Sequence, residues 1–120
     1  MQHDVTPTST IHAGGSEVTF INVFDVDPER QAELVDLLEG AASETMRRLP
    51  GFISASIHRS LDGTKVVNYM QWESTAAFEA TFADPGAQTQ RTRIAAVAQG
   101  YQLTPYEVSS IHEGTAQHGL

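Results

Sequence analysis

Two kinds of hydrophobic spacing follow one another along the chain. Residues 18–27 alternate and are rich in β-branched and aromatic residues, which predicts a first strand, and residues 52–60 and 65–73 predict two more, joined by Leu61-Asp62-Gly63. Residues 103–112 predict a fourth strand. Pro105 near its start suits the edge of a sheet, because proline cannot donate a hydrogen bond to a neighbouring strand.

The segments between these strands follow helical spacing and begin with capping residues. Asp27-Pro28 predicts the start of a helix that ends at Pro50-Gly51. Its inward positions are Leu34, Leu37, Leu38, Ala41, Ala42, Thr45 and Leu49. Ser74 caps a short helix, and Asp84-Pro85 begins another that turns Ile94, Ala95 and Ala98 inward and ends at Gly100.

The predicted order is β-α-β-β-α-β, with the second helical segment broken in two. This is the ferredoxin-like order of an α+β fold, in which helices cover one face of an antiparallel sheet. We expect one domain over residues 17–112. Residues 1–16 and 113–120 are polar and lack periodicity, so we expect flexible tails there.

The turn between the second and third strands decides which side chains share a face. Leu61-Asp62-Gly63 predicts a three-residue loop with a bulge. That loop predicts the cross-strand pairs Ser60–Thr64, His58–Val66, Ser56–Asn68, Ser54–Met70 and Phe52–Trp72. A two-residue Asp-Gly turn would shift the register by one residue and bring Ile57 beside Asn68 instead.

The two predicted sheet faces differ in character. One is apolar and consists of Ile21, Val23, Ile53, Ala55, Ile57, Val67, Tyr69, Tyr106 and Val108. The other mixes Phe20, Phe24, Phe52, Met70 and Trp72 with the polar residues Asn22, Ser54, Ser56, His58 and Asn68. Helices cover only one face, and the second is too apolar to face water. We therefore predict a homodimer whose sheets pack face to face.

Composition narrows the range of functions. The 120 residues carry a formal net charge of −8 and include no cysteine. The charge argues against nucleic acid and anionic membranes as partners, and the lack of cysteine excludes disulfides and thiolate chemistry. The first residues lack a signal-peptide pattern, and no apolar run approaches the about 20 residues needed to cross a bilayer. We therefore expect a soluble, cytoplasmic protein. His58 and His112 lack carboxylates at ligand spacing, so we expect no metal site.

The mixed face carries the candidate chemistry. A buried amide without a partner costs about 1–3 kcal/mol, so strand asparagines such as Asn22 and Asn68 usually line a cavity or bond to one another. Asn68, Met70 and Trp72 share one wall, which suits a flat aromatic ligand. A second interpretation stays open. A lone tryptophan in a small domain is more often a core residue, and Asn68 can bond the hydroxyl of Ser56.

Three runs of residues resemble one known family. They are Asn22-Val23-Phe24 with Asp27-Pro28-Glu29-Arg30, then Leu49-Pro50-Gly51-Phe52, and Asn68-Tyr69-Met70-Gln71-Trp72. Over about residues 17–112 the chain resembles the antibiotic biosynthesis monooxygenases, which are dimeric ferredoxin-like α+β barrels. The spacing of Asn68 and Trp72 is similar to that in the cofactor-independent anthrone oxygenases of aromatic polyketide pathways.

The resemblance implies a chemistry. A flat phenol or anthrone is deprotonated and reduces molecular oxygen, the co-substrate, and the peroxide collapses to a quinone without any other cofactor. Asn68 and Trp72 are the implied catalytic residues: Asn68 bonds the developing oxyanion or peroxide, and Trp72 donates its N–H or orients the ring. We expect the substrate to contact Asn22, Phe52, Ser56, His58, Met70, Phe78, Phe82 and Arg91.

The chain also departs from that pattern. Phe78 stands where those oxygenases tend to carry a tyrosine, so His58 or Tyr69 would have to exchange the proton. Arg91 and Arg93 flank the position of an expected arginine. Two alternatives therefore remain, a polyketide cyclase or aromatase on the same fold and a non-catalytic dimer that binds small aromatic molecules. Haem degradation, which related enzymes perform, is disfavoured because Phe82 takes the place of their histidine.

Overall fold

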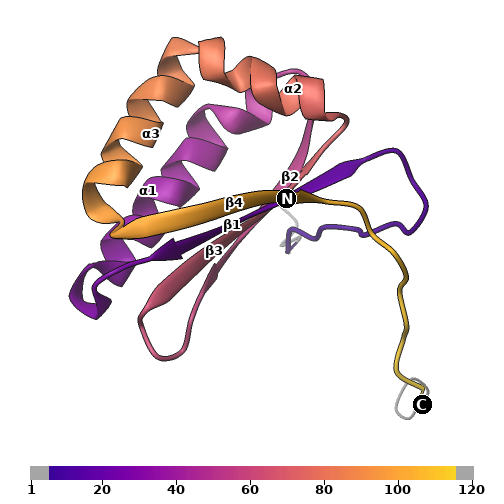
Figure 1. Ribbon diagram of the computed structural model, residues 1–120, viewed down its shortest axis with the longest axis horizontal. Coiled ribbons are helices and arrows are strands. Elements are labelled where there is room, and N and C mark those ends of the chain that lie inside the picture. The colour runs from indigo at the N-terminus through magenta and orange to yellow at the C-terminus, as the bar shows by residue number, and fades with distance from the viewer. Residues whose placement is uncertain (1–5, 116–120) are drawn as a thin grey trace, which may run out of the picture.

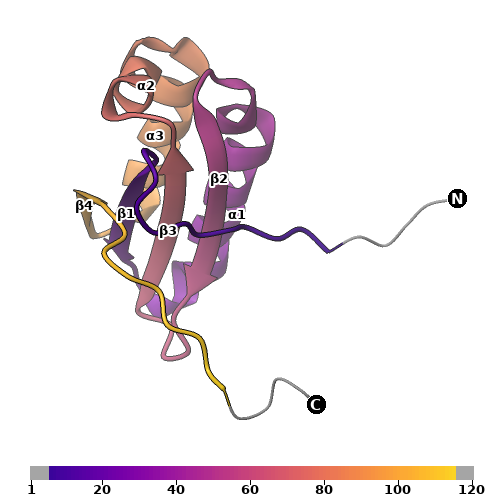
Figure 2. The ribbon, with the colours of Figure 1, turned by 90° about the vertical axis from the view of Figure 1, so that its right-hand side faces the viewer.

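The computed structural model describes residues 6–115, which form one antiparallel sheet with helices on one of its faces (Figures 1 and 2). The strands are β1 (Val18–Asp25), β2 (Phe52–Arg59), β3 (Lys65–Trp72) and β4 (Gly100–Tyr106), in the spatial order β2-β3-β1-β4. The helices are α1 (Gln31–Glu44), α2 (Thr75–Ala80) and α3 (Pro85–Val97). This is the expected ferredoxin-like fold, with the second helical segment divided between α2 and α3. No helix in the described part is long and apolar enough to cross a membrane.

The predicted caps are confirmed. Side-chain oxygens of Asp27, Ser74 and Asp84 accept backbone N–H groups at the starts of the three helical segments. Several boundaries differ from the prediction. A 3-10 turn at Pro28–Arg30 precedes α1, so the helix proper begins three residues after Pro28. At its other end α1 stops at Glu44, and a 3-10 turn at Met46–Arg48 leads towards Pro50-Gly51.

The last strand lies earlier in the chain than predicted. Helix α3 ends at Val97, and Gly100 begins β4 rather than ending the helix. Strand β4 ends at Tyr106 instead of residue 112, so Val108 lies outside the sheet.

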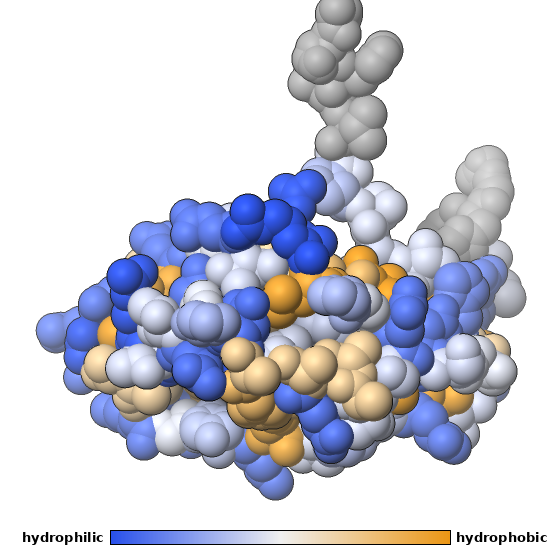
Figure 3. Space-filling view, turned by 90° about the horizontal axis from the view of Figure 1, so that it is seen from above, coloured by the Kyte–Doolittle hydropathy of each residue, from blue (hydrophilic) through white to orange (hydrophobic). Residues whose placement is uncertain are grey.

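The helices cover the mixed face of the sheet. One buried cluster joins this face to α1 and α3 and consists of Phe24, Val26, Leu34, Val35, Leu38, Val66 and Val97. A second lies towards α2 and consists of Phe20, Met70, Trp72 and Phe78. Seen from the side of α2 and α3, apolar side chains still reach the surface between polar ones (Figure 3). The candidate residues of the mixed face therefore lie between sheet and helices.

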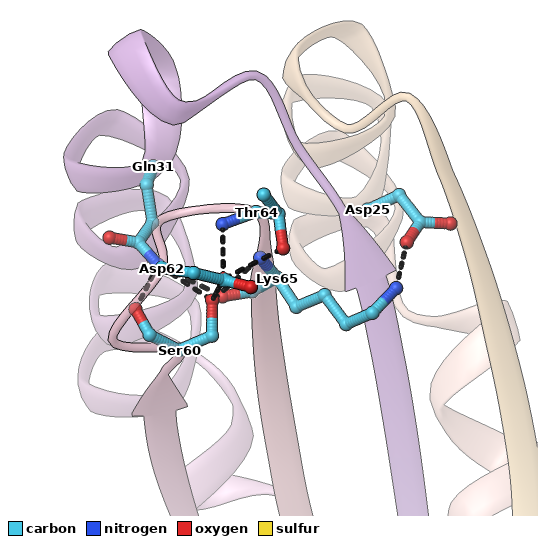
Figure 4. Close-up of polar contacts among 6 residues, drawn as sticks. All are labelled: Asp25, Gln31, Ser60, Asp62, Thr64 and Lys65. Carbon is cyan, nitrogen blue, oxygen red and sulfur yellow. Dashed lines mark hydrogen bonds and ion pairs between the residues drawn. The ribbon is translucent and has the colours of Figure 1, made fainter.

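The preferred hairpin register was wrong, and the alternative register is the one observed. Ile57 pairs with Asn68, Ser56 with Tyr69, and His58 with Val67. The loop contains four residues because the pair Ser60–Lys65 closes it, with a bond from Ser60 N to Lys65 O of 3.0 Å. The Asp62 carboxylate holds Thr64 inside the loop by accepting both its N–H and its hydroxyl (Figure 4).

The shifted register exchanges the faces of β2. Ala55 and Ile57 pack under the helices, whereas Ser56 and His58 lie on the open face of the sheet. A bulge at Ile53 then restores the expected pair Phe52–Trp72 at the far end of the hairpin. The predicted assignment of these four side chains is thus reversed, because one extra loop residue turns every side chain of a strand over.

Gly51 fixes the entry into β2. Its φ of +86° lies in the left-handed region, and a Cβ there would stand 2.4 Å from the Cβ of Ala77 on α2. The Gly51 carbonyl also accepts the N–H of Glu73 at 2.8 Å. The Leu-Pro-Gly-Phe run therefore needs glycine for two reasons, the turn and the close approach of α2.

The N-terminal segment runs across the open face of the sheet (Figure 2). Gln71 is only 5% exposed; its amide N–H donates to the Thr10 carbonyl at 2.9 Å, and its Oε1 accepts the hydroxyls of Ser9 and Ser54. The described part of the two predicted tails contains no helix or strand. Residues 1–5 and 116–120 lie outside the described residues, and the flexibility of the tails stays a prediction.

The hairpin loop predicts a pH-dependent contribution to stability. Hydrogen bonds from the Thr64 N–H and from the Ser60 and Thr64 hydroxyls lower the pKa of Asp62 from 3.8 to about 2. A carboxyl with a depressed native pKa stabilises the fold above its unfolded pKa and loses this effect as the pH falls through the native value. Asp62→Asn should therefore lower the free energy of unfolding at pH 7, and the difference from wild type should shrink as the pH falls from about 4 towards 2.

Urea denaturation between pH 7 and pH 2 measures this difference. The exposed Glu39 on α1 forms no side-chain hydrogen bond within residues 6–115, so Glu39→Gln is the matched control and should show little change with pH. A deficit of Asp62→Asn that stays constant down to pH 2 would contradict the role of the Asp62 carboxylate.

Candidate active site

A cavity of about 350 Å³ lies between the sheet and the helices α1 and α3. Its wall is largely apolar and includes Phe24, Leu38, Ala41, Ala42, Met46, Met70, Phe78, Phe82, Ile94, Ala95, Ala98 and Leu103. Its polar wall residues are Asn22, Asn68, Arg91, Thr92 and Tyr101. The cavity is partly open to solvent, and its exposed wall residues include Phe82 and Tyr101, which are 48% and 65% exposed. A volume near the lower end of ordinary ligand sites suits one flat molecule of modest size.

Two asparagines face each other on the floor of this cavity. Asn22 on β1 and Asn68 on β3 are direct cross-strand partners, so their side chains leave the same face of the sheet. The Oδ1 atom of each is buried and has no hydrogen-bond partner within residues 6–115. Ser56 pairs with Tyr69 on the opposite face, which removes the alternative in which Asn68 bonds the Ser56 hydroxyl. Two amide oxygens without partners thus lie at a largely apolar cavity, where they can accept hydrogen bonds from a ligand.

Phe78 on α2 forms the aromatic wall. Its ring stacks on Phe20 at 4.2 Å between centroids and meets the edges of Trp72 and Phe82 at 5.8 and 5.6 Å. Trp72 has no exposed surface, and it lies behind Phe78 rather than on the cavity wall. Phe52 contacts the Trp72 ring at 5.2 Å and is likewise outside the cavity. The Trp72 Nε1 has no acceptor within the described residues.

Arg91 on α3 is the one cationic residue of the cavity wall in the described part of the chain. Its Nη2 donates to the Thr81 hydroxyl at 2.6 Å and its Nη1 to the Thr81 carbonyl at 3.3 Å. The guanidinium also lies 4.1 Å from the centre of the Phe82 ring. Burial lowers the pKa of Arg91, while the charges of Asp84 and Tyr101 act in the opposite direction. Arginine nevertheless keeps its charge at neutral pH.

The predicted site residues separate into three groups. Those on the cavity wall are Asn22, Asn68, Met70, Phe78, Phe82 and Arg91. Phe52 and Trp72 pack behind the wall. Ser56 and His58 lie on the opposite face because the register prediction was wrong, and they do not reach the cavity. Tyr69 shares that opposite face, so neither His58 nor Tyr69 stands where Phe78 leaves a hydroxyl missing.

Tyr101 is a cavity residue that the sequence pattern did not predict. It lies at the start of β4 and its ring centroid is 6.1 Å from that of Phe24. The pattern placed the start of this strand at residue 103, which left Tyr101 in a loop. The alternation of β4 extended backwards past Leu103 is the signal that could have found it. Among the described residues, no cluster of three histidine or acidic side chains could hold a metal ion.

The aromatic wall predicts a large stability difference between two phenylalanines. Phe78→Ala removes a 5%-exposed ring that contacts three other rings, and we expect a loss of about 3–5 kcal/mol in the free energy of unfolding. Phe82→Ala removes a half-exposed ring and should cost less than half as much. Urea denaturation followed by the fluorescence of Trp72 measures both, and similar losses for the two variants would contradict this packing.

Comparison with known proteins agrees with this geometry. The family model described as antibiotic biosynthesis monooxygenase matches residues 18–91. Over 80 residues the chain is 48% identical to the tetracenomycin-F1 monooxygenase of Streptomyces glaucescens, covering 67% of this chain and 71% of the relative.

Two solved structures share the fold at appreciable identity. The ActVA-Orf6 monooxygenase of Streptomyces coelicolor, crystallised with nanaomycin D, superposes with a TM-score of 0.74 at 34% identity, over 83% of this chain and 94% of that one. SnoaB, described as a cofactor-independent oxygenase from Streptomyces nogalater, superposes with a TM-score of 0.70 at 26% identity, over 81% and 97%. The expected enzyme class, an oxygenase that works without a cofactor, is confirmed by these relatives. The chain belongs to the antibiotic biosynthesis monooxygenase family.

Proposed function

We propose that this enzyme oxidises a flat polycyclic phenol or anthrone to a quinone with molecular oxygen, in the biosynthesis of an aromatic polyketide. The observation that carries the proposal is the pair of unsatisfied amide oxygens, Oδ1 of Asn22 and of Asn68, in a largely apolar cavity. A polycyclic phenol supplies apolar faces for the wall, hydroxyl groups that donate to these oxygens, and oxygens that accept from the amide NH₂ groups. The nanaomycin D bound to the relative ActVA-Orf6 supports a ligand of this shape.

In the proposed reaction the activated ring carbon of the substrate loses a proton and transfers an electron to oxygen. The two radicals combine, and one proton completes a hydroperoxide on that carbon. Loss of the second hydrogen from the same carbon breaks the O–O bond, which releases water and leaves a carbonyl group. One substrate CH₂ and one O₂ thus give one C=O and one H₂O. The protein excludes water and stabilises negative charge as it develops.

The residues in and behind the cavity wall have different roles in the proposed reaction. In this proposal the NH₂ groups of Asn68 and Asn22 donate hydrogen bonds to the ring oxygens, and the Arg91 guanidinium stabilises the anion. Trp72 lies behind Phe78, so its part is to hold the wall; direct donation from its N–H would require the Phe78 ring to move. Phe78 cannot exchange a proton, and Tyr101 is the tyrosine on the cavity wall in the described part of the chain that can.

Oxygen uptake with an anthrone substrate tests this function. Admitting air to anaerobically prepared substrate should give enzyme-dependent consumption of one O₂ for each quinone formed. Asn68→Ala should lower kcat by about 100-fold, the usual effect of losing one preorganised hydrogen-bond donor to a developing anion. His58→Ala, on the opposite face of the sheet, is the matched control and should change kcat by less than about twofold.

Two outcomes would contradict the proposal. Product formation without oxygen uptake would indicate a cyclase or aromatase. Binding of the anthrone without any acceleration of its oxidation would indicate a non-catalytic binding protein.

The open face of the sheet supports a homodimer, which we also propose. Ile21, Val23, Val67 and Tyr69 share this face and are only half-buried in the single chain. The N-terminal segment covers the part of the face near Gln71 and leaves the remainder uncovered. A second sheet packed against it would remove these side chains from water.

The proposed dimer should depend on the apolar side chains of the open sheet face. Light scattering should give twice the chain mass of 13.0 kDa, and Val67→Glu should shift the protein towards the monomer because a carboxylate would be buried at the contact. Glu39→Gln on the exposed side of α1 is the control. A wild-type protein that stays monomeric at high concentration would rule out the dimer.

A further inference from the structure

Thr81 connects two elements of the site without lying on the cavity wall. It begins the 3-10 turn Thr81–Ala83 between α2 and α3, and it is only 2% exposed. Its hydroxyl donates to the Phe78 carbonyl at 2.7 Å and accepts Nη2 of Arg91 at 2.6 Å. Both hydrogen-bonding roles of this buried hydroxyl are therefore filled, which fixes its orientation.

The contacts of Thr81 also fix the arginine. Two nitrogens of one guanidinium bond to the hydroxyl and the carbonyl of the same residue. The planar group lies against the Phe82 ring at 4.1 Å, which restricts it from a third direction. An arginine side chain loses much conformational freedom when it is held in this way, so the orientation is determined by the fold before any ligand arrives.

The guanidinium held here forms no ion pair within residues 6–115, although the charge of the Asp84 carboxylate acts on it. Residues 6–115 contain three ion pairs, and Arg91 takes part in none of them. It lines a largely apolar cavity and is itself partly buried, so its charge is less screened than that of an exposed arginine. An anionic oxygen on a ligand would satisfy both the charge and the N–H groups that Thr81 does not use.

We propose that Thr81 is a positioning residue that directs the Arg91 guanidinium into the cavity, so that the site selects aromatic ligands with an ionised oxygen over neutral ligands of the same shape. The ionised group is a carboxylate or a phenolate on the edge of the ring system. The inference rests on the proposed function only for the flat aromatic shape of the ligand. It does not depend on oxygen consumption.

Two isosteric probes test the selection by binding alone. Anthraquinone-2-carboxylate and anthraquinone-2-carboxamide share one ring system and differ in charge. Isothermal titration at pH 7.5 should show that the wild-type protein binds the carboxylate about tenfold more tightly, the size expected of one oriented charge-assisted contact. Thr81→Val removes the hydroxyl at nearly constant volume; it should abolish this preference and leave the affinity for the carboxamide unchanged.

Thr81→Ser keeps the hydroxyl and should restore the preference. Thr81→Ala replaces Thr81→Val in the comparison if thermal melting shows that the valine variant does not fold. Three results would overturn the proposal: no preference for the carboxylate in the wild type, a preference that survives in the hydroxyl-free variant, or an equal loss of affinity for both probes. The last result would mean that Thr81 supports only the shape of the cavity.

This test separates the inference from the proposed reaction. A protein that prefers the carboxylate through Thr81 but consumes no oxygen would refute the oxidation and retain the role of Thr81. A protein that oxidises an anthrone but binds both probes equally would give the opposite outcome.

Discussion

The pairing of β1 with β3 beneath the helices is the constraint on which the site depends. It places Asn22 opposite Asn68 on the covered face, where the Oδ1 atom of each has no hydrogen-bond partner within residues 6–115. A buried polar atom without a partner costs stability, and a ligand that donates to these oxygens in the cavity would recover that cost. Phe78 on α2 and Arg91 on α3 line the same cavity as this pair. The two asparagines therefore determine where the polar groups of a ligand bind, and the helices determine how its rings lie.

Much of the fold follows from local chemistry that a sequence displays. Asp27, Ser74 and Asp84 cap helices wherever they occur in such contexts, and proline after two of them marks the first turn. Glycine at position 51 has a clear physical reason, because the left-handed backbone and the close approach of Ala77 both exclude a side chain. The alternation within β1 and β3 likewise places Asn22, Asn68 and Met70 on one wall, and the structure brings them together.

The remaining features of the fold and the site depend on contacts between residues far apart in the sequence, or on loop geometry that residue spacing alone does not determine. The loop length was decided by the Asp62 carboxylate and its three hydrogen bonds, which the Asp-Gly pattern does not reveal. Ser56 and His58 were misplaced as a result. Period-two spacing puts Trp72 on the same side as Asn68, yet Phe78 from another element stands between its ring and the cavity. Tyr101 was missed because the start of an edge strand is weakly marked.

The bulge at Ile53 has a consequence for the surroundings of Trp72. From Ser54 to Arg59, β2 keeps the register of the hairpin end, and only the pair Phe52–Trp72 lies one residue out of step with it. Without the extra residue in the bulge, the same register would place Ile53 opposite Trp72 and carry Phe52 past the end of β3. The bulge therefore gives Trp72 its aromatic cross-strand neighbour, with ring centroids 5.2 Å apart, while Ala55 and Ile57 still pack beneath the helices.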